Sequence, residues 1–70
     1  MNLTPMQKEV ILALADCGMK KFAAAKKMFV HYNTIEYHVY QIIRKTGKDP
    51  RKFYDLLDLV QMVKGETDNG

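Results

Sequence analysis

The sequence has no tryptophan, a single cysteine and no apolar run that approaches the roughly 18 residues of a membrane span. Cys17 alone cannot form an internal disulfide or a cysteine-based zinc site, and it fits a reducing compartment. The first ten residues contain no apolar signal-peptide core. We therefore expect a cytoplasmic protein without a membrane segment, formed by one small domain of marginal stability.

The features of an enzyme are also missing. The chain has no glycine-rich phosphate loop, and no nucleophile is spaced with a base and an orienting group in a catalytic pattern. His31 and His38 lie seven residues apart and lack a third ligand, so they do not predict a metal site. We expect no catalysis, no cofactor, no metal and no small-molecule ligand, and we expect His38 to pack between helices.

Positive charge is concentrated in the middle of the chain. Residues 20–52 contain nine bases and two acids, a net charge of +7, whereas residues 1–19 and 53–70 carry net charges of −1 and −3. This distribution is expected for a segment that contacts a polyanion such as DNA. The alternative is that the lysines only keep a small protein soluble.

The local signals predict four helices and no sheet. Thr4 and Gln7 have the spacing of a capping box with Pro5 between them, so the first helix begins there, and Gly18 ends it. This helix is apolar nearly all round, so we expect it to be central. Further helices are predicted over residues 21–29 and 32–46. Asp49-Pro50 is interpreted as the start of a fourth helix.

Three apolar residues at regular spacing predict a helix-turn-helix. Ala25 allows close approach of two helices, Val30 lies in the turn, and Ile35 is buried early in the third helix. Val39 and Ile42 are expected to be buried with them. Phe29 stands near the usual turn glycine, and we expect the turn to close without a positive φ. The predicted fold is all-α, with a winged-helix-like three-helical core without a wing, plus a C-terminal helix. Residues 1–64 would form the domain and residues 65–70 a disordered tail.

Two known families have similar motifs. The stretches LTPMQKEVILALADCG and FAAAKKMFVHYNTIEYHVYQIIRKTG resemble the LuxR/GerE-type helix-turn-helix domain. Thr34, Ile35 and His38 match the T-V-x-x-H part of its elbow, and Lys45 and Gly47 match its ending. The stretches AAKKMFVHYNT and TGKDPRKFYDLLDLVQMV are similar to the C-terminal helix-turn-helix of PucR-type regulators, which share an F-V-H-x-N-T turn.

The resemblance covers about residues 3–63. It implies a four-helix, DNA-binding domain of a transcription regulator, with the third helix as reader and the fourth often at a dimer interface. Three residues depart from the LuxR/GerE pattern. Lys20 replaces the usual cap of the second helix, Gln7 stands at a position that is more often acidic or variable, and His31 stands where a capping serine is common. Moreover, the reading helix carries only two bases, Arg44 and Lys45, both near its end.

The predicted partner is double-stranded DNA. We expect lysines of the second helix and Arg44 to contact phosphates, and polar or aromatic residues on the outer side of the third helix to enter the major groove. The complete set of predicted DNA-binding residues is Lys20, Lys21, Lys26, Lys27, Asn33, Thr34, Tyr37, Tyr40, Gln41 and Arg44.

Several of these residues also have a second interpretation. Asn33 can bind adenine, but Asn33 and Glu36 have capping-box spacing. Lys20 and Lys21 conflict with the positive end of the helix dipole, which a bound phosphate would relieve, although a solvated pair costs little. Tyr37 and Tyr40 could equally form a protein interface.

The fourth helix has more apolar residues than one side needs. We expect Phe53, Leu56, Leu57 and Val60 to face the core, and we interpret Leu59, Met62 and Val63 as the interface of a homodimer. Coverage of these residues by the first helix is the competing hypothesis. The rival function is a helix-turn-helix that contacts only proteins, as an adaptor or assembly module.

Overall fold

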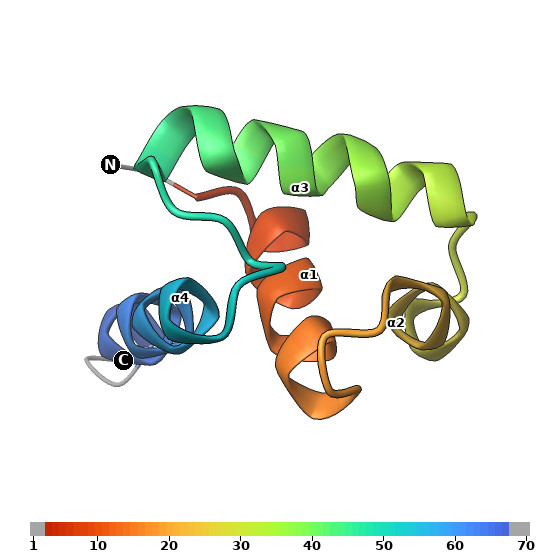
Figure 1. The fold of residues 1–70 in the computed structure, drawn as a ribbon, viewed down its shortest axis with the longest axis horizontal. Coiled ribbons are helices and arrows are strands. Elements are labelled where there is room, and N and C mark those ends of the chain that lie inside the picture. The colour runs from red at the N-terminus through yellow and green to blue at the C-terminus, as the bar shows by residue number, and fades with distance from the viewer. Residues whose placement is uncertain (1–2, 68–70) are drawn as a thin grey trace.

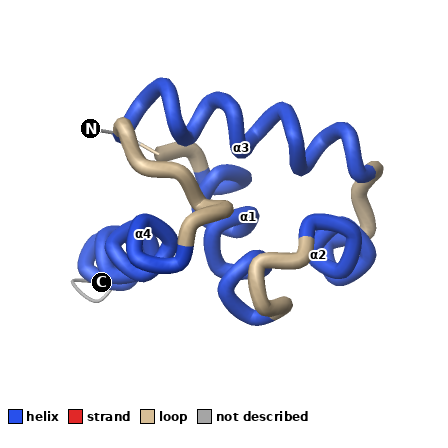
Figure 2. Tube along the Cα trace, viewed as in Figure 1, coloured by secondary structure: helices blue, strands red, loops and turns tan. Residues whose placement is uncertain are grey.

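The fold consists of four helices joined by short loops (Figures 1 and 2). The computed structural model describes residues 3–67, and within that range it contains no strand. The helices are α1 (Pro5–Asp16), α2 (Lys21–Met28), α3 (Tyr32–Thr46) and α4 (Phe53–Thr67). The predicted all-α helix-turn-helix fold is confirmed.

Helix α1 is the centre of the domain, as its apolar surface predicted. It packs against α2, α3 and α4, and Figure 1 shows α3 crossing over it with α2 and α4 on opposite sides. Val10, Ile11 and Leu14 of α1 are fully buried. The remaining buried apolar residues are Leu3, Ala13, Ala24, Ala25, Ile35, Val39, Ile42, Leu56, Leu59 and Val63.

The beginning of α1 also fastens the far end of α3. The Thr4 hydroxyl accepts from the backbone N–H of Gln7, and the Gln7 side chain accepts from the backbone N–H of Thr4, which confirms the predicted capping box. The same Oε1 atom of buried Gln7 accepts a hydrogen bond from Lys45 Nζ at 3.0 Å. The Gln7 side chain therefore accepts a backbone N–H at the start of α1 and also hydrogen-bonds to the last turn of α3.

The elbow between α2 and α3 closes with a positive φ, contrary to the prediction. Phe29 has φ 59° and ψ 41°, the left-handed conformation that glycine usually supplies at this position. Its N–H donates to Lys26 O and the N–H of Val30 donates to Ala25 O, which is the Schellman pattern. Val30 is half-buried rather than fully buried. The prediction was wrong because a turn that is closed by these two hydrogen bonds needs a left-handed residue at position 29, whether or not that residue is glycine.

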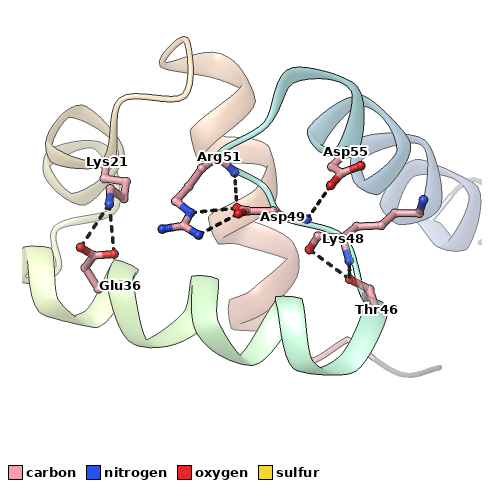
Figure 3. Close-up of polar contacts among 7 residues, drawn as sticks. All are labelled: Lys21, Glu36, Thr46, Lys48, Asp49, Arg51 and Asp55. Carbon is pink, nitrogen blue, oxygen red and sulfur yellow. Dashed lines mark hydrogen bonds and ion pairs between the residues drawn. The ribbon is translucent and has the colours of Figure 1, made fainter.

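Helix α4 begins at Phe53, three residues later than Asp49-Pro50 predicted. The Asp49 carboxylate accepts from the backbone N–H and the guanidinium of Arg51, so it stabilises a turn instead of capping a helix (Figure 3). Hydrogen bonds from Arg51 lower the pKa of Asp49. The backbone N–H of Asp49 donates to the Asp55 carboxylate at 3.1 Å, which ties the turn to the first turn of α4.

The predicted core side of α4 is confirmed for Leu56, which is buried, and for Val60, which packs against the core, but it is wrong for the other two residues. Leu59 and Val63 are 0% and 1% exposed because they pack into the core, while Phe53 and Leu57 are 59% and 43% exposed. Met62 is half-buried against the core. The interpretation of Leu59 and Val63 as a homodimer interface was therefore wrong. The core of the monomer covers these residues, as the competing hypothesis held.

Helix α4 also extends further than expected. It continues to Thr67, so residues 65–67 of the predicted tail are helical, and residues 68–70 lie outside the described part. Among the described helices, none is long and apolar enough to cross a membrane.

Candidate nucleic-acid interface

Helix α3 has one buried side and one exposed side. Ile35, Val39 and Ile42 are at most 2% exposed and fix the helix on the core. The predicted outward positions are indeed outside, because Asn33, Tyr37, Tyr40 and Arg44 are all exposed, and Thr34 and Gln41 at their border are half-buried. The structure thus brings together all six predicted residues of this helix on an accessible surface.

The N-terminus of α3 is capped by His31. Its Nδ1 atom accepts a hydrogen bond of 3.0 Å from the backbone N–H of Asn33. Asn33 is therefore inside the first turn, and the alternative that it caps the helix with Glu36 was wrong. The side chain of Asn33 stays exposed to solvent.

Glu36 is occupied by two partners within the fold. Lys21 Nζ lies 3.1 Å from both carboxylate oxygens (Figure 3). The Tyr32 hydroxyl donates to Oε2 at 2.9 Å. The hydrogen bond from Lys21, and after it the one from Tyr32, lowers the pKa of Glu36. The hydrogen bond to Glu36 in turn raises the pKa of Lys21. The negative charge of Glu36, the one acid in the first two turns of α3, is thereby compensated by the Lys21 ammonium.

An aromatic contact reinforces this pair. The ring of Phe22 stacks on that of Tyr32 with 4.1 Å between centroids and 18° between planes. The Lys21 ammonium lies 5.6 Å from the Tyr32 centroid. We call Lys21, Phe22, Tyr32 and Glu36 the elbow clamp. Sequence reasoning missed it, although the four-residue spacing of Tyr32 and Glu36 was a readable signal.

The three lysines of α2 and the lysine at its N-cap have different environments. Lys20 is exposed at the N-cap and makes no side-chain capping bond, and Lys26 is exposed on the helix. Lys21 belongs to the elbow clamp, whereas Lys27 lies 3.9 Å from Asp16 of α1. Of the four, only Lys20 and Lys26 form no ion pair within the described residues.

Two of the outward residues of α3 contact each other. Arg44 Nη1 lies 3.3 Å from the Tyr40 hydroxyl, and its guanidinium carbon lies 5.7 Å from the Tyr40 ring centroid. Both side chains are exposed, so this contact is open to exchange with a ligand. The basic end of α3 and its tyrosine therefore form one surface.

The histidine and acid side chains do not come together as a metal centre. Within residues 3–67, no three His, Cys, Asp or Glu residues are placed to hold a metal ion. His38 is half-buried, packs edge-on against Tyr37, and leaves its buried Nδ1 atom without a hydrogen bond to any described residue. Its predicted packing at the contact between the second and third helices stays a prediction.

Two helices crossing at a tight elbow, with the second buried on one side and open on the other, define a helix-turn-helix domain. The chain belongs to the family of the PucR C-terminal helix-turn-helix domain, whose model matches residues 8–64. This confirms the PucR-type resemblance, while the LuxR/GerE-type resemblance gains no support from the comparison.

Similar proteins are known from mycobacteria. The chain is 44% identical over 46 residues to uncharacterized proteins of Mycobacterium tuberculosis and Mycobacterium bovis. The matched segment is 66% of this chain and 11% of each relative, so the chain spans a small part of the length of these proteins. No solved structure matches the chain significantly.

Proposed function

We propose that this domain binds double-stranded DNA as part of a transcription regulator, with α3 in the major groove. The observation that carries the proposal is the outward side of α3, on which Asn33, Tyr37, Tyr40 and Arg44 are exposed while the opposite side is held in the core. A helix of 15 residues is about 22 Å long, enough to follow the groove across several base pairs.

The side chains on this surface suit different parts of the duplex. Asn33 and Gln41 have amides that can bind adenine, and the ring of Tyr37 can contact a thymine methyl group. Arg44 can leave Tyr40 for a phosphate, because an exposed hydrogen bond of 3.3 Å to a neutral hydroxyl is weaker than one to a charged phosphate oxygen. Because Lys21 pairs with Glu36, the first two turns of α3 present no unpaired acid to the duplex.

Backbone contacts would come from the start of α2. Lys20 leaves the first N–H groups of α2 without a side-chain cap, and these groups together with the Lys20 ammonium favour an anion. Lys26 adds a second exposed charge on the same helix. Lys21 and Lys27, by contrast, already face Glu36 and Asp16, so we assign less of the phosphate affinity to them.

The test is selection of bound duplexes from a random pool, followed by affinity measurements at two salt concentrations. We expect an enriched sequence and an affinity that falls steeply with salt. Replacing Asn33→Ala should relax the preference at one position of the enriched site, whereas Gln61→Ala on the exposed side of α4 serves as control. Binding without enrichment and without a salt slope would contradict the proposal.

A protein-contact function is favoured by one observation. Phe29 and Phe22 are 95% and 69% exposed beside the elbow, and exposed aromatic residues are typical anchors of protein interfaces. In that case Phe29→Ser would abolish binding to a protein partner, and no duplex would be enriched in the selection.

A further inference from the structure

The side chain of His31 is only partly explained by its role in the fold. Its Nδ1 atom accepts from the backbone N–H of Asn33 and so caps α3. Serine, aspartate and asparagine are the preferred residues for this task, and histidine is not among them. Because a smaller side chain would cap the helix as well, the remainder of the imidazole ring is free for another role.

The capping bond determines where the ring can donate. A neutral imidazole has one nitrogen that donates and one that accepts. Since Nδ1 accepts from Asn33, the proton of the neutral ring is on Nε2. The residue is exposed, so a fixed N–H donor is presented to solvent at the beginning of α3. The cap thus restrains both the orientation of the ring and its tautomer.

The position of this donor suits a phosphate. In a helix-turn-helix the first residues of the recognition helix contact base edges, so the residue before its first turn stands at the rim of the groove, where the sugar-phosphate backbone runs. Within α3 the acid nearest to His31 in sequence is Glu36, and its charge is compensated by Lys21. A phosphate oxygen that approaches the ring therefore meets a positive helix end and no uncompensated acid of the first two turns.

We propose that His31 is a positioning residue of the DNA interface, which donates from Nε2 to a backbone phosphate while Nδ1 caps α3. This inference rests on the proposed DNA binding. In this arrangement the His31 side chain connects the start of α3 to the sugar-phosphate backbone of the duplex. This contact sets how deeply α3 enters the groove.

Two variants separate capping from phosphate binding. His31→Ser keeps a capping oxygen but is too short to replace Nε2, whereas His31→Ala removes both functions. We expect His31→Ser to unfold at a temperature no lower than the wild type and to bind the selected duplex about tenfold more weakly, as for loss of a hydrogen bond to a charged acceptor. His31→Ala should show the same loss of affinity together with a lower unfolding temperature.

Phosphate ethylation interference supplies a readout that capping alone would not change. In the wild type, ethylation of the phosphate that His31 contacts should interfere with binding, and in His31→Ser this position of the selected site should become insensitive while the others remain. An identical pattern and affinity for wild type and His31→Ser would overturn the inference but leave DNA binding intact. If the wild type itself selects no duplex, the proposed function fails, and this assignment fails with it.

Discussion

Lys21 of α2 and Glu36 of α3 lie 15 residues apart in sequence, yet the ammonium is 3.1 Å from both oxygens of the carboxylate. The pair bridges the two helices of the elbow on the side where Phe22 stacks on Tyr32. Both charges are partly exposed, and such a pair contributes at most about 1 kcal/mol. Its importance is that it links α2 to α3 at the elbow and compensates the charge of Glu36.

The pair predicts a specific dependence of stability on pH. The pKa of Glu36 is lowered from its ordinary value of 4.5, so its contribution is present above that value and is lost as the pH falls through the folded-state pKa. The pKa of Lys21 is raised from 10.5, so the same contribution is lost as the pH rises above that value. Thermal unfolding of Glu36→Gln should show a weaker decline below about pH 4.5 than the wild type. The matched control is Glu9→Gln, an exposed acid of α1; an equal change in both variants would contradict the role of the pair.

The left-handed Phe29 predicts a stabilising substitution. A side chain at this φ costs roughly 1–2 kcal/mol relative to glycine, partly offset by the larger entropy of glycine in the unfolded chain. Since the ring is 95% exposed, Phe29→Gly removes little packing. We expect a gain of about 0.5–1 kcal/mol in the free energy of unfolding, measured in urea.

The reverse change at Gly47 is the control for this prediction. Gly47 has φ 74° at the end of α3, and a Cβ there would meet no atom within 4 Å. Gly47→Ala should therefore destabilise by about 1 kcal/mol through the backbone alone. If Phe29→Gly destabilised as well, the ring would have contacts that its exposure does not indicate.

Two of the three leucines of α4 predict a contrast in stability. Leu59 is fully buried, so Leu59→Ala should cost about 2–5 kcal/mol and could unfold a domain whose total stability is about 5 kcal/mol. Leu57 is 43% exposed, and Leu57→Ala should cost less than about 1 kcal/mol. Circular dichroism during urea unfolding measures both. Dissociation of a folded Leu59→Lys variant from a dimer, without unfolding, would contradict the core assignment.

The lysines at the start of α2 should affect DNA binding unequally. Lys20→Gln should weaken binding to all duplexes and reduce the slope of log affinity against log salt by about 0.9, the value for one phosphate contact. Lys21→Gln should change the slope less and lower stability, because its charge is already used by Glu36. Fluorescence anisotropy over a salt series distinguishes the two. A larger slope change for Lys21→Gln would mean that the pair opens on DNA.

Local signals in the sequence predicted much of the fold. The capping box at Thr4 and Gln7 and the glycine after α3 act within one turn of chain, so their effect could be read directly. The side of α3 that carries Ile35, Val39 and Ile42 was also predictable, because its polar and apolar positions alternate with a clear helical period. These elements placed the six outward residues of α3 correctly.

The errors came from choices that distant contacts decide. In α4 apolar residues occupy two overlapping sides, and only packing on α1 selects Leu59 and Val63 over Phe53 and Leu57. Position 29 has a left-handed conformation but carries phenylalanine instead of glycine, so no residue in the sequence indicated the positive φ. The partner of Glu36 lies in another helix, beyond any local pattern. The site was thus predictable where it consists of one helix and not where two helices meet.

The attachment of α4 has a consequence for communication within the domain. Among the helices, α4 packs only on α1, whereas α1 also packs on α2 and α3. The loop before α4 adds the bonds from Asp49 to Asp55 and from Lys48 to Asp58. A perturbation at the exposed aromatic start of α4 can therefore reach α3 by two routes, through the body of α1 or along this loop. Stiffening either route is a way to alter how strongly the two ends of the domain are coupled.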